Sequence, residues 1–93
     1  MEGHSVVAPE VIGRYARDAA VEVAGVARVV EGVRKGVRVD GGGIVLHLAL
    51  DWGVSIPEVG ASIQRDVADY LERMTEIRPT SVEVVVEELG APA

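Results

Sequence analysis

Two histidines are the first side chains to consider, because imidazole serves both as a catalytic base and as a metal ligand. His47 lies in a segment of alternating apolar residues, and the alternation points it away from the face that carries Leu46 and Leu48. An exposed or interface histidine is the simpler interpretation of this position. His4 lies in the N-terminal tail, where a fixed ligand geometry is not expected.

Three acids, Asp66, Asp69 and Glu72, fall on one predicted helix, where their carboxylates could in principle flank a cation. Neither a histidine nor an acidic loop accompanies them, so the spacing is typical of a solvated helix surface. The triplet Gly41-Gly42-Gly43 precedes a strand and lacks the lysine and hydroxyl residue of a phosphate loop, which indicates a hairpin turn. No serine has a G-x-S-x-G context. We therefore expect no enzymatic activity, no cofactor and no metal.

Composition narrows the class of protein further. The 93 residues make one small domain, and the lack of cysteine excludes disulfides, thiolate metal sites and cysteine nucleophiles. Fifteen acids against nine bases give a formal charge of −6, which repels phosphate backbones, so we expect no nucleic acid partner. No segment approaches the roughly 20 apolar residues that cross a bilayer, and no signal-peptide pattern is present. We expect a cytoplasmic protein without direct membrane insertion.

Two local features could serve contacts with other molecules. Arg34, Lys35 and Arg38 form the only local basic cluster, and solubilising charge is a simpler interpretation of it than contact with anionic lipid. Trp52, the sole tryptophan, follows a predicted strand and precedes Gly53. Large aromatic side chains often anchor interfaces, but burial against the first turn of the following helix is at least as good an interpretation.

Hydrophobic spacing predicts two helices and four strands. Apolar residues recur at three- and four-residue spacing over 8–23, which predicts an amphipathic helix that Gly25 closes. A second helix is predicted over about 56–76, with Ser55 as its cap and Pro57 in its first turn. Strands are predicted at 26–30, 37–40, 44–51 and 81–88.

The order of these elements, α-β-β-β-α-β, predicts an α+β fold. Short links suggest that the first three strands form an antiparallel meander, and the helix before the last strand suggests that this strand returns parallel to another strand by a right-handed crossover. We predict a two-layer sandwich in which a four-stranded mixed sheet carries both helices on one face. The domain is expected to span 8–89, with tails at 1–7 and 90–93.

If both helices cover one face of the sheet, the chain supplies no cover for the other face. That face would be mixed and half apolar, and the mean hydropathy of +0.25 is high for so small a monomer. A protein partner or a second copy is the natural hypothesis for its cover. The residues predicted to form this interface are Arg38, Val45, His47, Trp52 and Val85.

Several segments, in order, resemble the alkaline shock and general stress protein family of bacterial envelope stress response proteins. They are Val23-Ala24-Gly25-Val26, Gly36-Val37-Arg38-Val39, Gly53 to Val59, and Met74-Thr75 followed by Val82 to Val86. The resemblance implies a role in envelope stress or cell-envelope homeostasis, no catalytic residues, and gathering at the membrane through an integral membrane partner. Loop 32–36 is shorter than in many relatives, so contacts that a longer loop makes there do not carry over.

We therefore predict a non-enzymatic cytoplasmic interaction or scaffold protein that self-associates as a homo-oligomer. An integral membrane anchoring protein is expected to recruit it to the inner face of the cell membrane. The alternative is a small nucleic-acid-binding α+β module, because two helices on a small sheet also occur in RNA-binding domains. The charge of −6, the lack of stacking aromatics on the predicted strands and the lack of a G-x-x-G loop argue against that alternative.

Overall fold

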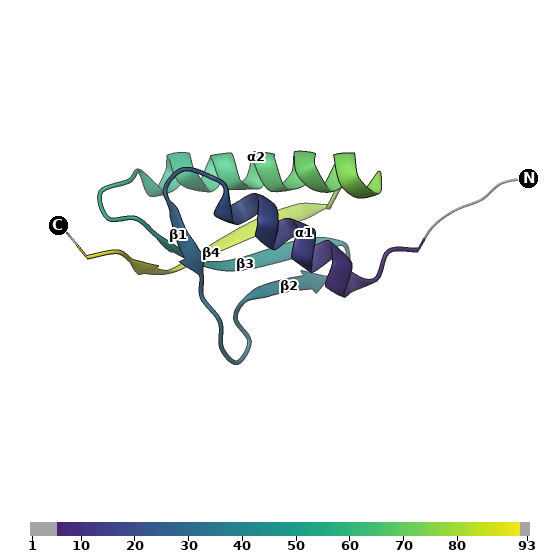
Figure 1. Ribbon diagram of the computed structural model, residues 1–93, viewed down its shortest axis with the longest axis horizontal. Helices are drawn as coiled ribbons and strands as arrows, with labels where there is room; N and C mark the ends of the chain where they lie inside the picture. The colour runs from purple at the N-terminus through teal and green to yellow at the C-terminus, as the bar shows by residue number, and fades with distance from the viewer. Residues whose placement is uncertain (1–5, 92–93) are drawn as a thin grey trace, which may run out of the picture.

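The structure is a computed structural model that describes residues 6–91, so His4 and the outer parts of both predicted tails lie outside it. Its elements are α1 (Pro9–Val21), β1 (Val26–Val29), β2 (Val37–Asp40), β3 (Gly43–Leu50), α2 (Ile56–Thr75) and β4 (Ser81–Leu89). The two helices form one layer over one face of the four-stranded sheet (Figure 1). The predicted α+β sandwich, with its order of elements, is confirmed.

Helix α1 begins at a proline and ends earlier than predicted. Pro9 occupies the first turn, where a missing N–H leaves no helical bond unmade. The helix ends at Val21, before the predicted closing residue Gly25. Gly25 instead shapes the turn into β1 with a φ of +100°, and a Cβ there would lie 2.8 Å from Cγ2 of Val59. Glycine is required at this turn both by its backbone and by the nearby core.

Helix α2 begins and ends close to the predicted residues. The N–H of Glu58 donates to Oγ of Ser55 at 3.3 Å, which satisfies one of the amides that the first turn leaves without a helical partner. The helix ends after Thr75 because Glu76 adopts the left-handed conformation, with a φ of 62°. The N–H of Glu76 still donates to the carbonyl of Glu72 at 2.8 Å, so the last turn is closed.

Strand β3 is the centre of the sheet and pairs with each of the other strands. Strand β4 runs parallel to β3, as the crossover through α2 predicted. Strands β1 and β2 both run antiparallel to β3 along its other edge, β1 beside its C-terminal half and β2 beside its N-terminal half. The predicted meander, in which β1 would pair with β2, is therefore wrong.

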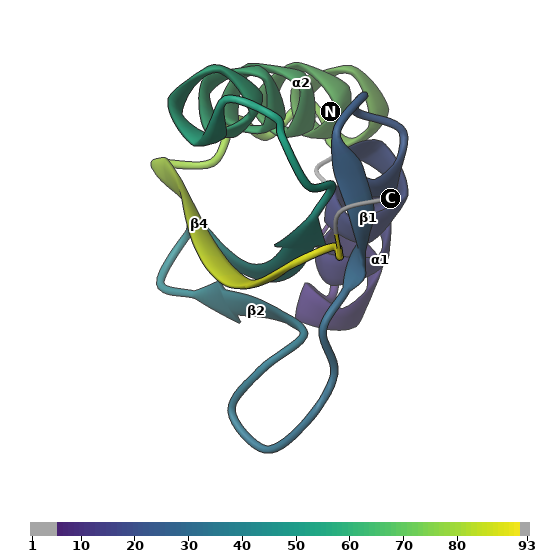
Figure 2. The same cartoon turned by 90° about the vertical axis from the view of Figure 1, so that its left-hand side faces the viewer.

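The segment between β1 and β2 explains this arrangement. The N–H of Val30 donates to the carbonyl of His47 at 2.8 Å, and the N–H of His47 donates to the carbonyl of Gly36 at 3.0 Å. The chain thus leaves the edge of β3 at Val30 and returns to the same edge at Gly36, with the N–H of Gly36 bonded to the carbonyl of Val30 at 2.8 Å. The residues between them form a loop that projects from the molecule (Figure 2).

The hydrophobic core lies between β3 and the two helices. Alternate side chains of β3 point into it, and each is at most 1% exposed. These residues are Ile44, Leu46, Leu48 and Leu50, and Ile63, Val67 and Leu71 of α2 meet them. Ala16 and Ala20, both 0% exposed, let α1 approach closely. Each large side chain buried in this way contributes about 1.5–3 kcal/mol of hydrophobic free energy.

Candidate interaction surface

The outer face of the sheet brings together four of the five predicted interface residues. Arg38 of β2 lies beside Val45 of β3, and His47 of β3 lies beside Val85 of β4. Because alternate residues of a strand share a face, these four side chains form one patch on the side away from the helices. Arg38 is exposed, and the other three are partly buried. Their role as partner contacts stays a prediction.

Trp52 lies apart from this patch, in the turn between β3 and α2. It is 57% exposed, so its burial against the first turn of α2 is wrong. Leu89 ends β4, pairs with Leu50 and is 44% exposed. The residue after it, Gly90, lies close to the backbone of Trp52, because a Cβ on Gly90 would be 3.4 Å from the backbone nitrogen of Trp52. Ile56, at 42% exposed, begins α2. We call the apolar surface of Trp52, Ile56 and Leu89 the Trp52 end.

The chain covers part of the outer face itself. Ala49 points away from the helices, yet it is only 4% exposed. Arg28 of β1 and Glu88 of β4 flank it in the register, and Nη2 of Arg28 lies 2.7 Å from Oε2 of Glu88. This ion pair crosses over Ala49. The expectation that the chain supplies no cover for this face is therefore wrong near the C-terminal end of β3, where the long charged side chains of Arg28 and Glu88 shield Ala49.

A second charged group fixes His47. Nδ1 of His47 lies 2.8 Å from Oε2 of Glu87, and Nζ of Lys35 lies 3.1 Å from Oε1 of the same carboxylate. An ionised carboxylate only accepts hydrogen bonds, so the imidazole donates from Nδ1. The bond with His47, followed by the bond from Lys35, lowers the pKa of Glu87 from its ordinary value of 4.5. His47 is thus held by its own chain, which fits a structural or interface residue.

Sequence reasoning missed these pairs because a bulge creates them. The register between β3 and β4 shifts after Leu48, where Val86 is its partner, so that Ala49 pairs with Glu88. Glu87 is the extra residue, and it turns toward His47 while Glu88 turns toward Arg28. The two adjacent glutamates were the only signal in the sequence, and alternation alone places just one of them on this face.

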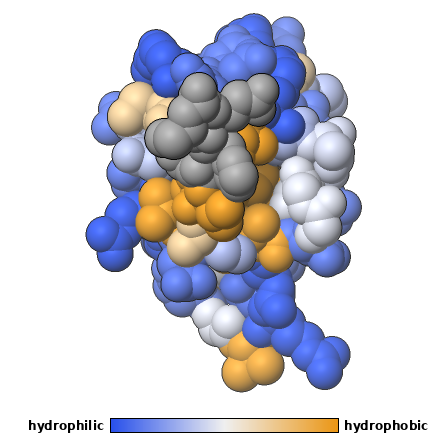
Figure 3. Space-filling view, turned by 90° about the vertical axis from the view of Figure 1, so that its right-hand side faces the viewer, coloured by the Kyte–Doolittle hydropathy of each residue, from blue (hydrophilic) through white to orange (hydrophobic). Residues whose placement is uncertain are grey.

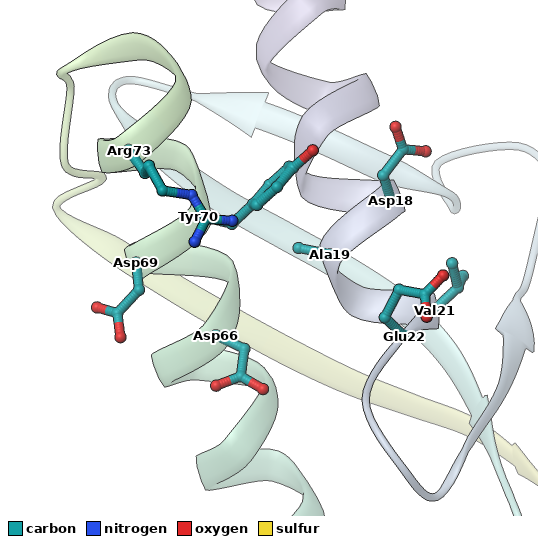
Figure 4. Close-up of a pocket in the computed structure, with 8 residues that line it drawn as sticks. All are labelled: Asp18, Ala19, Val21, Glu22, Asp66, Asp69, Tyr70 and Arg73. Carbon is teal, nitrogen blue, oxygen red and sulfur yellow. The ribbon is translucent and has the colours of Figure 1, made fainter.

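A groove of about 730 Å³ runs between α1 and α2 (Figure 4). Its lining includes the acids Asp18, Glu22, Asp66 and Asp69, together with Tyr70 and Arg73. Figure 4 shows the carboxylates of Asp18, Asp66 and Asp69 pointing in different directions rather than toward one centre. Within residues 6–91, no group of three or more His, Cys, Asp or Glu side chains is placed to hold a metal ion.

The acids of α2 are instead engaged by arginines. Nη1 of Arg78 lies 3.1 Å from Oδ1 of Asp69 and 3.0 Å from Oε1 of Glu72. Asp66 pairs with Arg65 at 3.1 Å. The hydrogen bonds to Asp69 and Glu72 raise the pKa of Arg78. All of these side chains are about half exposed, which is what the interpretation as a solvated helix surface predicts.

Apolar side chains also gather at the end of the molecule opposite the Trp52 end (Figure 3). Val11 of α1, Met74 of α2 and Ile77 are 44%, 45% and 46% exposed. The predicted basic cluster of Arg34, Lys35 and Arg38 does not form a patch of free positive charge, because Lys35 pairs with Glu87. No helix in the described part of the chain is long and apolar enough to cross a membrane.

The chain is a small α+β domain. Its described residues form apolar and charged surfaces that other molecules can contact, and they do not bring reactive side chains together at one centre. The chain belongs to the alkaline shock protein family, which is described by a cell envelope-related function and whose family model matches residues 1–91. The resemblance found in the sequence segments is thereby confirmed. No curated protein sequence matches the chain.

Solved structures of the MamM CTD share the fold. Two of them, one a nickel form, are 21% identical to the chain, and a third is 22% identical. Each match covers 85% of this chain, and the shares of the other chains are 93%, 96% and 95%. The TM-score is 0.52 in each case. At this level of identity the likeness shows the α+β arrangement alone.

Proposed function

We propose that this protein is a non-enzymatic interaction protein of cell-envelope homeostasis that self-associates and is recruited to the inner face of the membrane by an integral membrane partner. Membership of a family with a cell envelope-related function supports the setting.

The observation that carries the proposal is the exposed apolar surface of the Trp52 end. Trp52, Ile56 and Leu89 each leave more than two-fifths of their surface exposed. An exposed tryptophan together with exposed aliphatic residues of the neighbouring helix start and strand end has the composition of an interface hot spot, where a large aromatic residue fills a pocket of the partner. The groove and the outer face supply no competing reactive centre, which supports a binding role over a catalytic one.

The experiment is co-purification of the tagged protein from membranes of its host, followed by identification of bound proteins. Trp52→Ala is expected to reduce the recovered membrane partner by about tenfold or more, since hot-spot truncations cost at least about 2 kcal/mol. Met74→Ala is the matched control, because Met74 is similarly exposed at the opposite end of α2. It should leave recovery unchanged.

Imaging of the tagged protein tests recruitment independently. The proposal predicts a peripheral distribution that becomes uniform when the membrane partner is deleted. A uniform distribution under every growth and stress condition would contradict recruitment. Equal recovery of the partner with both variants would contradict the Trp52 end as the surface that binds it.

A further inference from the structure

Strand β4 presents an open edge. It has nine residues and pairs with β3 on one side. Within residues 6–91, no strand pairs with its other side. An edge strand of this length is a template for a further strand, because its outward N–H and C=O groups lack partners in the sheet.

The hydrogen bonds identify which residues of β4 face outward. His47 of β3 bonds to Val30 and Gly36 on the β1 and β2 side, so odd-numbered residues of β3 face that side and even-numbered ones face β4. In the parallel ladder, the N–H and C=O groups of Val82, Val84 and Val86 then point away from β3. The carbonyl of Val82 confirms this direction, because it accepts a hydrogen bond from Nε2 of Gln64 at 3.1 Å.

Helix α2 carries an uncharged stripe beside this edge. Gln64 reaches β4, and residues three, four or seven positions away lie on the same side of the helix. None of these positions is charged: Pro57 and Ala61 are exposed, Gly60 is partly exposed, and Val67, Ala68 and Leu71 are buried. In a chain with 26% charged residues, this small, uncharged stripe leaves room for a second helix without like-charge repulsion.

The sequence of β4 is complementary to itself in one antiparallel register. With Val84 opposite Val84 of a second copy, Val82 lies opposite Val86 on the helix side, and Glu83 lies opposite Val85 on the outer face. Centring the pair on Glu83 would oppose two glutamates directly, and centring it on Val85 would oppose Glu83 and Glu87. Like charges directly opposite are destabilising. Centring on Val86 would place the bulge at Glu87 next to the centre of the ladder, whereas centring on Val84 leaves it at the end, opposite Ser81.

We infer that a second copy of this chain pairs with the open edge of β4 in the register centred on Val84, which joins two sheets into one across a two-fold axis. This deepens the self-association of the proposed function and rests on it. In the pair, the N–H of Val86 from the second copy bonds to the carbonyl of Val82, where Gln64 donates in the single chain. The helix-side valines of the two copies extend both cores under the uncharged stripes.

Cysteine cross-linking tests the register, because the chain has no cysteine of its own. Glu83→Cys and Val85→Cys proteins are mixed and mildly oxidised. The inference predicts that the disulfide between the two variants exceeds either self-disulfide at least severalfold, because only the mixed pair faces across the junction. Val45→Cys is the control, since Val45 lies on the same face but in β3, away from the junction. It should stay uncross-linked.

Two charge variants test the same pair without oxidation. Val85→Lys places an ammonium opposite Glu83 of the second copy at both symmetric positions, and it should lower the dimer dissociation constant roughly three- to tenfold. Val85→Glu should raise it by a similar factor. Circular dichroism verifies that both variants fold.

The outcomes separate this inference from the proposed function. If the wild type associates but the variants at Glu83 and Val85 cross-link no more than Val45→Cys, the β4 interface is refuted and self-association stands. A dominant self-disulfide of Val85→Cys refutes the register. A wild type that sediments as a monomer at every concentration refutes both the interface and self-association.

Discussion

Nδ1 of His47 lies 2.8 Å from Oε2 of Glu87, and this contact joins the outer face of β3 to β4. Lys35, which lies in the projecting loop between β1 and β2, reaches the other oxygen of the same carboxylate at 3.1 Å. Glu87 thus holds the loop against the outer face of the sheet. Glu31 of the same loop pairs with Arg17 of α1 at 2.6 Å, so Glu87 is one of two carboxylates that hold the loop in place.

Replacement of Glu87 by glutamine should loosen the loop. Glu87→Gln removes the charge that Lys35 pairs with, so amide hydrogen exchange should accelerate at Gly32 to Lys35 while the core of β3 stays protected. Glu83→Gln, on the same face of β4, is the control and should leave this exchange unchanged. Equal protection of the loop in both variants would show that Glu87 does not hold it.

The same contact predicts a pH dependence. Because the pKa of Glu87 is lower in the folded than in the unfolded chain, its stabilisation is fully present above about pH 4.5 and is lost as the pH falls through the folded-state pKa. The difference in free energy of unfolding between wild type and Glu87→Gln should therefore be present at pH 7 and vanish at strongly acidic pH. Urea titrations at several pH values measure it. A difference that grows on acidification would have the wrong sign.

Two glycines offer a matched test of the turn before β1. Gly25→Ala suffers both from positive φ and from a Cβ placed 2.8 Å from Val59, whereas Gly53, with a φ of +87°, has nothing within 4 Å. We expect Gly53→Ala to cost about 1–2 kcal/mol of stability from the backbone alone. Gly25→Ala should cost about 1–3 kcal/mol more from the collision with the core. Chemical denaturation measures both, and equal costs would contradict the close approach of α2.

The cap of α2 should contribute modestly to stability. Ser55→Ala removes the acceptor for the N–H of Glu58 and should cost about 1 kcal/mol. Ser55→Asp keeps an acceptor and should cost less than the alanine variant. Thermal or urea unfolding distinguishes them. If both variants lose the same stability, the side-chain oxygen is not what matters at this position.

Trp52 should matter little for folding. Because it is 57% exposed, Trp52→Ala should change the free energy of unfolding by less than about 1 kcal/mol. Leu46→Ala, at a fully buried position, should cost about 2–5 kcal/mol. A cost for Trp52→Ala as large as that for Leu46→Ala would mean that Trp52 serves the core rather than a partner.

Local patterns in the sequence predicted the elements well, because each depends on near neighbours. The alternation from Ile44 to Leu50 and the cap at Ser55 are encoded within a few residues. The first helix was predicted too long because Gly25 is required by its contact with Val59, which is distant in sequence. Likewise, no local pattern shows that β1 and β2 share one edge of β3, since hydrophobic periodicity does not name a strand's partner.

The candidate surface was predictable to the same extent. Alternation placed Arg38, Val45, His47 and Val85 on one face, and the register makes them neighbours. The charged groups that cover part of this face depend on the bulge at Glu87, a long-range feature of the pairing between β3 and β4. Whether Trp52 is buried or exposed depends on the path of the turn into α2, which composition does not fix.

Sedimentation equilibrium of the wild-type protein tests the central claim, that this domain works through contacts with other chains, its own copies included. Over roughly 1 μM to 1 mM, the range in which weak and moderate associations appear, the average mass should rise well above the 9.8 kDa of one chain. A mass that stays at 9.8 kDa throughout would contradict self-association.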